Sequence, residues 1–177
     1  MSKISRLLLV LLLVSTAVLG CRKEKSAEEA FRFVVYPGAR YLPHLTELTK
    51  QAHKIIKPSE EPPPTAIYDT DASVDNVANF YVQSYGYPAI APEATSTGGA
   101  DKPPAFRRSG DLQTDTKAIE PLLPKLNLQT DVSKAVGKYN AVEIAPKTNR
   151  PRVTVQRPYF DATTSQVVDR TLILMSR

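Results

Sequence analysis

The clearest repeating pattern along the chain is helical, and it occurs twice. In the range 43–57 apolar residues recur every three or four positions and polar residues take the other face, which predicts a helix that ends before Pro58. In the range 74–85 the same spacing predicts a second helix, with Ser73 as its N-cap and Gly86 as its C-terminal stop. The apolar stripe of the first helix is Leu45, Leu48, Ala52, Ile55 and Ile56, opposite Thr46, Glu47, Lys50, Gln51 and Lys54.

Strand patterns dominate the C-terminal part of the chain. β-Branched segments predict three strands at residues 139–145, 152–157 and 167–175, and two more are expected at 65–70 and 105–112. The links between the last three are short and rich in turn-forming residues, which favours an antiparallel meander. The pattern therefore predicts an α+β fold, an antiparallel sheet with a C-terminal three-stranded meander and helices packed on one face.

Other segments have weaker patterns. Residues 31–36 are aromatic and β-branched and stop at the turn signal Pro37-Gly38. Residues 87–104 are rich in Pro, Ala, Thr, Ser and Gly and are expected to be irregular. Short helical pieces are expected at 117–128, interrupted by prolines, and at 131–136.

The first twenty residues have the pattern of a secretory leader. Lys3 and Arg6 precede an apolar run that starts at Leu7 and ends with the small residue Gly20. The uncharged stretch is shorter than the roughly 20 helical residues that span a bilayer, so we expect cleavage rather than a membrane span. The organisation predicted is a leader at 1–20, a charged and flexible tether at 21–30, and one α+β domain at 31–177.

The residues at the end of the leader resemble a known motif. Val18-Leu19-Gly20-Cys21 is similar to the lipobox of bacterial lipoproteins, in which a small residue precedes a cysteine. The resemblance implies cleavage between Gly20 and Cys21, a diacylglycerol thioether on Cys21, and membrane lipid as the partner of that residue. An Asp after the lipidated Cys resembles an inner-membrane retention signal. This chain has Arg22 there, which favours the outer membrane, facing the periplasm, in a bacterium with two membranes.

A second resemblance lies in the first half of the predicted domain. Val35-Tyr36-Pro37-Gly38-Ala39 is followed by Tyr68-Asp69-Thr70 and then by Val77-Ala78-Asn79-Phe80-Tyr81. This order is similar to small bacterial envelope proteins with a YPGA segment and a V-x-x-F-Y helix. It implies an exported domain and no particular activity.

Charge and cysteine content narrow the classes of partner. The net charge is +5, two of the basic residues lie in the leader, and no basic run is interleaved with aromatic residues, so no nucleic-acid partner is expected. Cys21 is the one cysteine, so a disulfide framework within the chain is excluded.

Residues with catalytic or metal-binding chemistry are few. His44 and His53 are nine positions apart, which does not place them on one helical face as metal ligands, and we expect His53 on the helix surface. No phosphate-binding glycine loop, nucleophile elbow or paired cysteine motif occurs, so neither a cofactor nor a metal is expected.

Three groups of polar or aromatic residues are candidates for a site. Asp69 and Asp71 lie before the second helix, where carboxylates serve either as acid and base or, as we favour, in turn formation and capping. The arginines Arg152, Arg157 and Arg170 would suit an anionic ligand if they converged, and otherwise form a solvated face. The pair Tyr159-Phe160 is a partner-binding patch if exposed and core if buried, and core is favoured.

The sequence favours a non-enzymatic, membrane-anchored lipoprotein with a structural or partner-binding role, with another envelope protein as a further partner. An envelope hydrolase that uses Asp69 and Asp71 and a binding module for an anionic ligand are the two alternatives.

Overall fold

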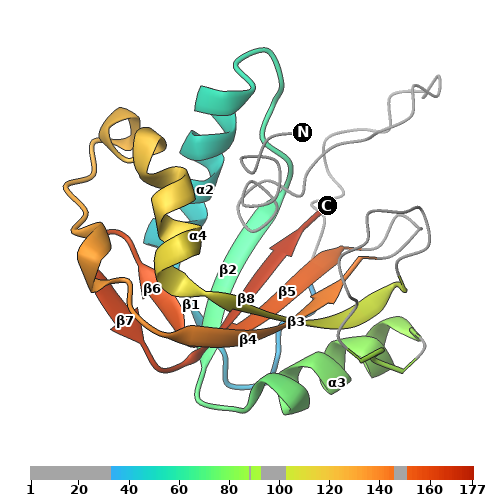
Figure 1. Cartoon of the computed structure of the whole chain (residues 1–177). Helices are drawn as coiled ribbons and strands as arrows, with labels where there is room; N and C mark the ends of the chain where they lie inside the picture. Colours follow the sequence, from blue (N-terminus) through green and yellow to red (C-terminus); the bar gives the residue numbers. More distant parts are fainter. Residues whose placement is uncertain (1–32, 88, 93–102, 146–150) are drawn as a thin grey trace.

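The computed structural model describes residues 33–87, 89–92, 103–145 and 151–177. The predicted leader, its cleavage position, Cys21 and the tether lie outside the described residues. A six-stranded sheet with the order β1-β2-β8-β5-β4-β3 forms the centre of the described chain, and every neighbouring pair is antiparallel (Figure 1). Its strands are β1 (Arg40–Tyr41), β2 (Thr65–Thr70), β3 (Ala105–Asp111), β4 (Lys138–Ile144), β5 (Arg152–Arg157) and β8 (Thr171–Ser176).

The antiparallel sheet and its C-terminal meander confirm the predicted α+β class. Strands β4, β5 and β8 are neighbours in the sheet, as expected. The predicted strand at 167–175 is wrong in one respect, because it is divided in two. Its first residues form β7 (Gln166–Val168), which pairs with β6 (Tyr159–Asp161) in a separate two-stranded sheet. The division falls at Asp169 and Arg170, whose side chains leave the strand pattern to form ion pairs.

The helices are α2 (Pro43–Ile56), α3 (Val74–Tyr85) and α4 (Leu112–Ile119). The predicted ends of α3 are confirmed: the Ser73 side chain accepts a hydrogen bond from the Asn76 amide, and Gly86 ends the helix in the left-handed region that glycine adopts most readily. Helix α4 starts earlier than predicted because Asp111 caps it by accepting from the Thr114 amide. Prolines fit the two tighter turns that follow, the 3₁₀ helices η1 (Glu120–Leu122) and η2 (Pro124–Leu126). A third 3₁₀ helix, η3 (Val132–Lys134), starts at Asp131, whose side chain accepts from the Ser133 amide.

The helices cover both faces of the sheet, not one as predicted. Figure 1 shows α3 on one side of the sheet and α2 with α4 on the other. The reason lies in β8, where Ile173 and Met175 face α3 while Leu172 and Leu174 face the opposite side. A strand that is apolar on both faces needs cover on both.

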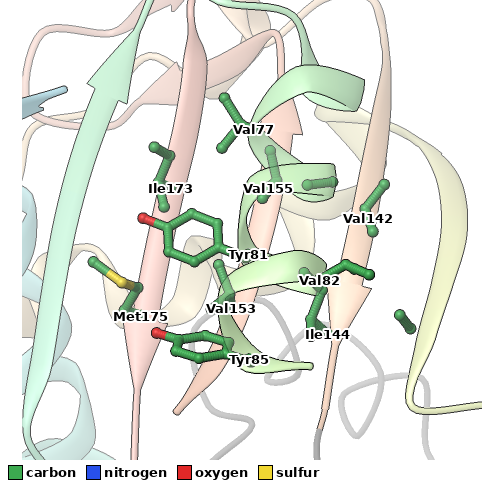
Figure 2. Close-up of a cluster of buried hydrophobic side chains, with 12 residues drawn as sticks. Val77, Tyr81, Val82, Tyr85, Val142, Ile144, Val153, Val155, Ile173 and Met175 are labelled. Atoms are coloured by element: carbon green, nitrogen blue, oxygen red, sulfur yellow. The ribbon is translucent and has the colours of Figure 1, made fainter. Parts of the chain in front are cut away.

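The main core lies between α3 and the sheet. In Figure 2, Val77, Tyr81 and Tyr85 of α3 point toward valine, isoleucine and methionine side chains of β4, β5 and β8. Tyr81 is fully buried, and its hydroxyl accepts a hydrogen bond from the Tyr36 amide at 3.2 Å. The ring of Tyr36 also packs edge-on against Phe80, with centroids 5.2 Å apart.

The contact between Tyr36 and α3 joins the two parts of the YPGA and V-x-x-F-Y pattern. Residues 33–36 form no strand, but the turn predicted at Pro37-Gly38 is present. This segment packs against the core beside α3 through Phe33, Tyr36 and Ala39. Within the described residues, no helix is long and apolar enough to cross a bilayer.

A glycine in β3 makes room for a buried aromatic ring. Gly110 lies opposite Tyr139 in the β3–β4 register, and a Cβ atom built on Gly110 would lie 2.3 Å from Tyr139 Cζ. The ring covers the glycine backbone directly, so a larger residue there forces Tyr139 to move.

We therefore expect Gly110→Ala to lower the free energy of unfolding by about 1–3 kcal/mol, the usual effect of overpacking a filled core. Urea unfolding followed by circular dichroism measures the change. The matched control is Ser109→Ala, which alters the adjacent, exposed position and should change stability by less than about 0.5 kcal/mol. Equal effects of the two substitutions would contradict the close contact.

Candidate functional site

An apolar cavity lies between α2, α4 and the face of the sheet that α3 does not cover. Its volume is about 150 Å³. Aliphatic side chains from the two helices form one part of the wall, and Leu172 and Leu174 of β8 with the aromatic pair in β6 form another. The lining residues are Leu45, Leu48, Thr49, Ala52, Ile67, Leu112, Asp115, Thr116, Ile119, Leu123, Leu126, Tyr139, Gln156, Tyr159, Phe160, Ala162, Leu172 and Leu174.

Tyr159 and Phe160 both line this cavity. Tyr159 is buried in the cluster of apolar side chains beneath α2, as predicted. Phe160 is partly buried and packs against the cluster around Tyr139. The pair therefore belongs to the interior and does not form an exposed patch.

A network of polar side chains fixes one wall of the cavity. The Tyr139 hydroxyl donates to Asp115 and accepts from Arg108 Nη1 at 2.5 Å. The guanidinium of Arg108 also lies over the Tyr139 ring, 5.1 Å from its centroid, and 3.2 Å from the buried carboxylate of Glu143. Burial, together with the hydrogen bond to Asp115, raises the pKa of Tyr139, so its hydroxyl stays protonated at neutral pH.

Gln156 contributes the amide group in the cavity wall. Its neighbours Val153 and Val155 face α3, so the alternation of β5 directs Gln156 to the opposite side. The side chain is 6% exposed. Its Nε2 atom donates to the Pro158 carbonyl at 3.2 Å, whereas Oε1 is buried with no hydrogen-bond partner.

Asp69 lies fully buried at the centre of an ion-pair cluster beside the cavity. Arg40 binds its carboxylate with two hydrogen bonds, of 3.1 and 2.7 Å, and Arg170 Nε lies 3.1 Å from Oδ2. The Tyr159 hydroxyl donates to the same oxygen at 3.2 Å. Burial by itself would raise the pKa of Asp69, but the two guanidinium groups more than offset it and hold the pKa below its usual value.

The predicted pair Asp69 and Asp71 does not form a facing pair of carboxylates. Asp71 is exposed and pairs with Arg170, on the solvent side of that guanidinium. A general acid needs a carboxyl group with a raised pKa, whereas Asp69 is held ionised. This arrangement favours a structural role for Asp69, as an anchor that joins β1, β2, β6 and the start of β8.

The three arginines proposed as an anion site do not converge. Arg157 and Arg170 meet at Asp71, where Arg157 Nη1 donates to the Asp71 carbonyl at 3.0 Å. Arg152 lies at the other end of β5, opposite Ser176. Arg157 is itself ion-paired with Asp169 at 2.8 Å.

A polar concavity of about 520 Å³ lies beside Arg157, at the start of α3. Arg107 and Asp75 also line it, and they form an ion pair of 2.6 Å. Three arginines line the concavity, and each has an ion-pair partner: Arg107 with Asp75, Arg157 with Asp169, and Arg108 with the buried Glu143. Their charges are thus matched within the protein, which does not favour an anionic ligand.

The histidines lie on different sides of α2. His44 is at the start of the helix, with Nε2 3.3 Å from Asp161 Oδ2. The surface position predicted for His53 is wrong, because its side chain is 3% exposed. His53 lies on the buried face of α2 with Thr46, Thr49 and Ala52, so this buried stripe includes three polar residues. Across the described ranges, no group of three or more His, Cys, Asp or Glu side chains could hold a metal ion.

Comparisons of the chain with protein-family models, with curated proteins and with solved structures find no match. The two resemblances stated from the sequence, the lipobox and the YPGA pattern, stay predictions. The residues that the sequence reasoning missed are Gln156 and the leucines of the α4 region. Gln156 has no local signal in the sequence, because its burial depends on the strands β4 and β8 on either side of β5.

Asp69→Asn should lower the free energy of unfolding at pH 7 by about 1–3 kcal/mol, because the hydrogen bonds from Arg40, Arg170 and Tyr159 lose their charged acceptor. Asp71→Asn is the matched control, since its exposed ion pair with Arg170 contributes at most about 1 kcal/mol. Denaturant unfolding of both variants gives the comparison.

The same substitution should change the pH dependence of stability. The pKa of Asp69 is lower in the folded state than in the unfolded state. Its carboxylate therefore contributes fully to the free energy of unfolding above the unfolded-state pKa of about 3.9. This contribution disappears as the pH falls through the folded-state pKa. The melting temperature of Asp69→Asn should therefore fall less than that of the parent protein between about pH 5 and pH 2.5. An equal fall in melting temperature for the two proteins would contradict the stabilising role of the Asp69 carboxylate.

Proposed function

We propose that this protein is a lipid-anchored bacterial envelope lipoprotein whose α+β domain binds a small apolar molecule without transforming it. The observation that carries the proposal is the cavity between α2, α4 and the sheet. A pocket with an apolar wall and a few polar groups is the usual form of a small-molecule site. An engineered apolar cavity of roughly 150 Å³ in another protein is large enough for benzene, which gives the scale of ligand that fits here.

A binding role is favoured over catalysis by the state of the polar groups around the cavity. The hydroxyls of Tyr139 and Tyr159 donate to carboxylates, and burial raises the pKa of both groups, which keeps them neutral. The nearby carboxylate of Asp69 is held by two arginines. None of these groups has the poised protonation state that acid–base chemistry needs.

The anchor is proposed from the sequence. The leader and the Val18-Leu19-Gly20-Cys21 segment support lipidation of Cys21, and two or more acyl chains give stable attachment where a single chain is marginal. Arg22 favours the outer membrane, facing the periplasm. A role in contact with another envelope protein is compatible with the same anchor.

Expression of the full chain in a bacterium with two membranes tests the anchor. We expect the protein in the membrane fraction, and an intact mass that starts at Cys21 and exceeds the polypeptide mass by a diacylglycerol with or without a third acyl chain. Cys21→Ser should abolish the added mass and leave the protein without acyl groups. An unmodified Cys21 in the parent protein would contradict the lipoprotein assignment.

Binding to the cavity is tested with toluene and the mature chain carrying Cys21→Ser, which needs no detergent. We expect saturable binding with a Kd on the order of 1 mM or tighter, from burial of the ring. Calorimetry or ligand-observed NMR measures it.

Ala52→Leu should weaken toluene binding at least tenfold, because the added side chain occupies the cavity from α2. The matched control is Ala118→Leu in α4, where the residue does not line the cavity and toluene binding should not change. Failure of toluene to bind the parent protein would contradict the proposed function.

A further inference from the structure

The cavity wall contains one buried hydrogen-bond acceptor that the protein itself does not use. Among the described residues, several buried side-chain atoms lack a hydrogen-bond partner, and Gln156 Oε1 is the one that belongs to a residue lining the cavity. Buried polar atoms are nearly always paired, so an exception in a cavity wall points to a group supplied from outside.

The orientation of the Gln156 amide is fixed by its other end. Nε2 donates to the Pro158 carbonyl at 3.2 Å. Rotation of the amide by half a turn would place Oε1 against that carbonyl oxygen, and two acceptors would then face each other. The free atom is therefore an acceptor, and its partner must be a donor.

Three hydroxyl groups of the wall are already engaged. The Tyr139 hydroxyl donates to Asp115 and accepts from Arg108, and the Tyr159 hydroxyl donates to Asp69. The Thr49 hydroxyl donates to the Leu45 carbonyl within α2. Their donor protons are thus used inside the protein, whereas Gln156 Oε1 is a buried acceptor without a partner.

The charge of the wall sets a second condition. Asp115 is the one charged residue among the lining side chains, and its carboxylate lies 3.9 Å from Arg108, which offsets part of its charge. The lining includes no basic side chain to pair with an anionic ligand, so fatty acids and aromatic carboxylates are poorly suited to the cavity.

We infer that the cavity takes a neutral molecule of about six to eight non-hydrogen atoms, with an apolar ring or short chain and one hydrogen-bond donor that pairs with Gln156 Oε1. This inference rests on the proposed function and specifies the ligand class of that same cavity. A phenol or a short alcohol has this chemistry, and toluene is the matched ligand of similar size without a donor.

The experiment compares phenol with toluene on the mature Cys21→Ser chain and on the same chain with Gln156→Met, which keeps the length of the side chain and removes the acceptor. We expect Gln156→Met to weaken phenol binding about tenfold and to leave toluene binding unchanged or stronger, as for the loss of one buried hydrogen bond. Thr49→Val is the control within the same wall, because the Thr49 hydroxyl already donates to the Leu45 carbonyl, and it should leave the ratio of the two affinities unchanged.

The outcomes separate the inference from the proposed function. If both ligands bind and Gln156→Met leaves the ratio of affinities unchanged, the assignment of Gln156 is overturned and the binding cavity stands. If neither ligand binds the parent protein, the proposed function fails.

A measurement on the parent protein covers the case in which Gln156→Met does not fold. The side-chain carbonyl carbon of Gln156 should shift on addition of phenol and not on addition of toluene, as observed by NMR. The same shift with both ligands overturns the inference.

Discussion

Strand β8, in the middle of the sheet, is apolar on both faces, and the arrangement of the helices follows from this constraint. In β8, Ile173 and Met175 face one side while Leu172 and Leu174 face the other. Both faces must be removed from water, so α3 packs on one and α2 with α4 on the other. The two sides are filled differently. Tyr81, Tyr85 and several valines fill the α3 side, whereas the α2 and α4 side retains a cavity of about 150 Å³.

The ion-pair cluster around Asp69 complements this packing at the end of the sheet. Asp69 belongs to β2, and its partners come from β1, β6 and the residue before β8. These segments are far apart in the sequence, and a buried carboxylate with two guanidinium partners and a phenol holds them in one arrangement. Tyr159 links the cluster to the cavity, since its hydroxyl binds Asp69 and its ring lines the apolar wall.

Local signals explain which parts of the fold could be predicted. Helix α3 was predicted with both ends because Ser73 and Gly86 act within one turn of the helix. The covering of both faces was not predicted, because it depends on the position of Thr171–Ser176 in the middle of the sheet. Burial of His53 was missed for a related reason: Thr46, Thr49 and His53 resemble a solvent-facing stripe until the helix is placed on the sheet.

The candidate site depended even more on tertiary structure. The sequence indicated that Tyr159 and Phe160 are interior residues, and the structure places them in the cavity wall. Gln156 gave no such signal, because a glutamine beside valines in a strand is typical of a half-exposed sheet. Only the neighbours β4 and β8, together with the cover from α2 and α4, turn this position into a buried one.

The contact of Tyr36 with Phe80 and Tyr81 has a mechanical consequence for a tethered protein. A pull on the chain that precedes Phe33 would first load the packing between this segment and α3. The walls of the cavity belong to the opposite face of the sheet, so they are shielded from that load by the full thickness of the β layer. Motion of the proposed lipid anchor would therefore load the α3 side of the sheet before the side that holds the cavity.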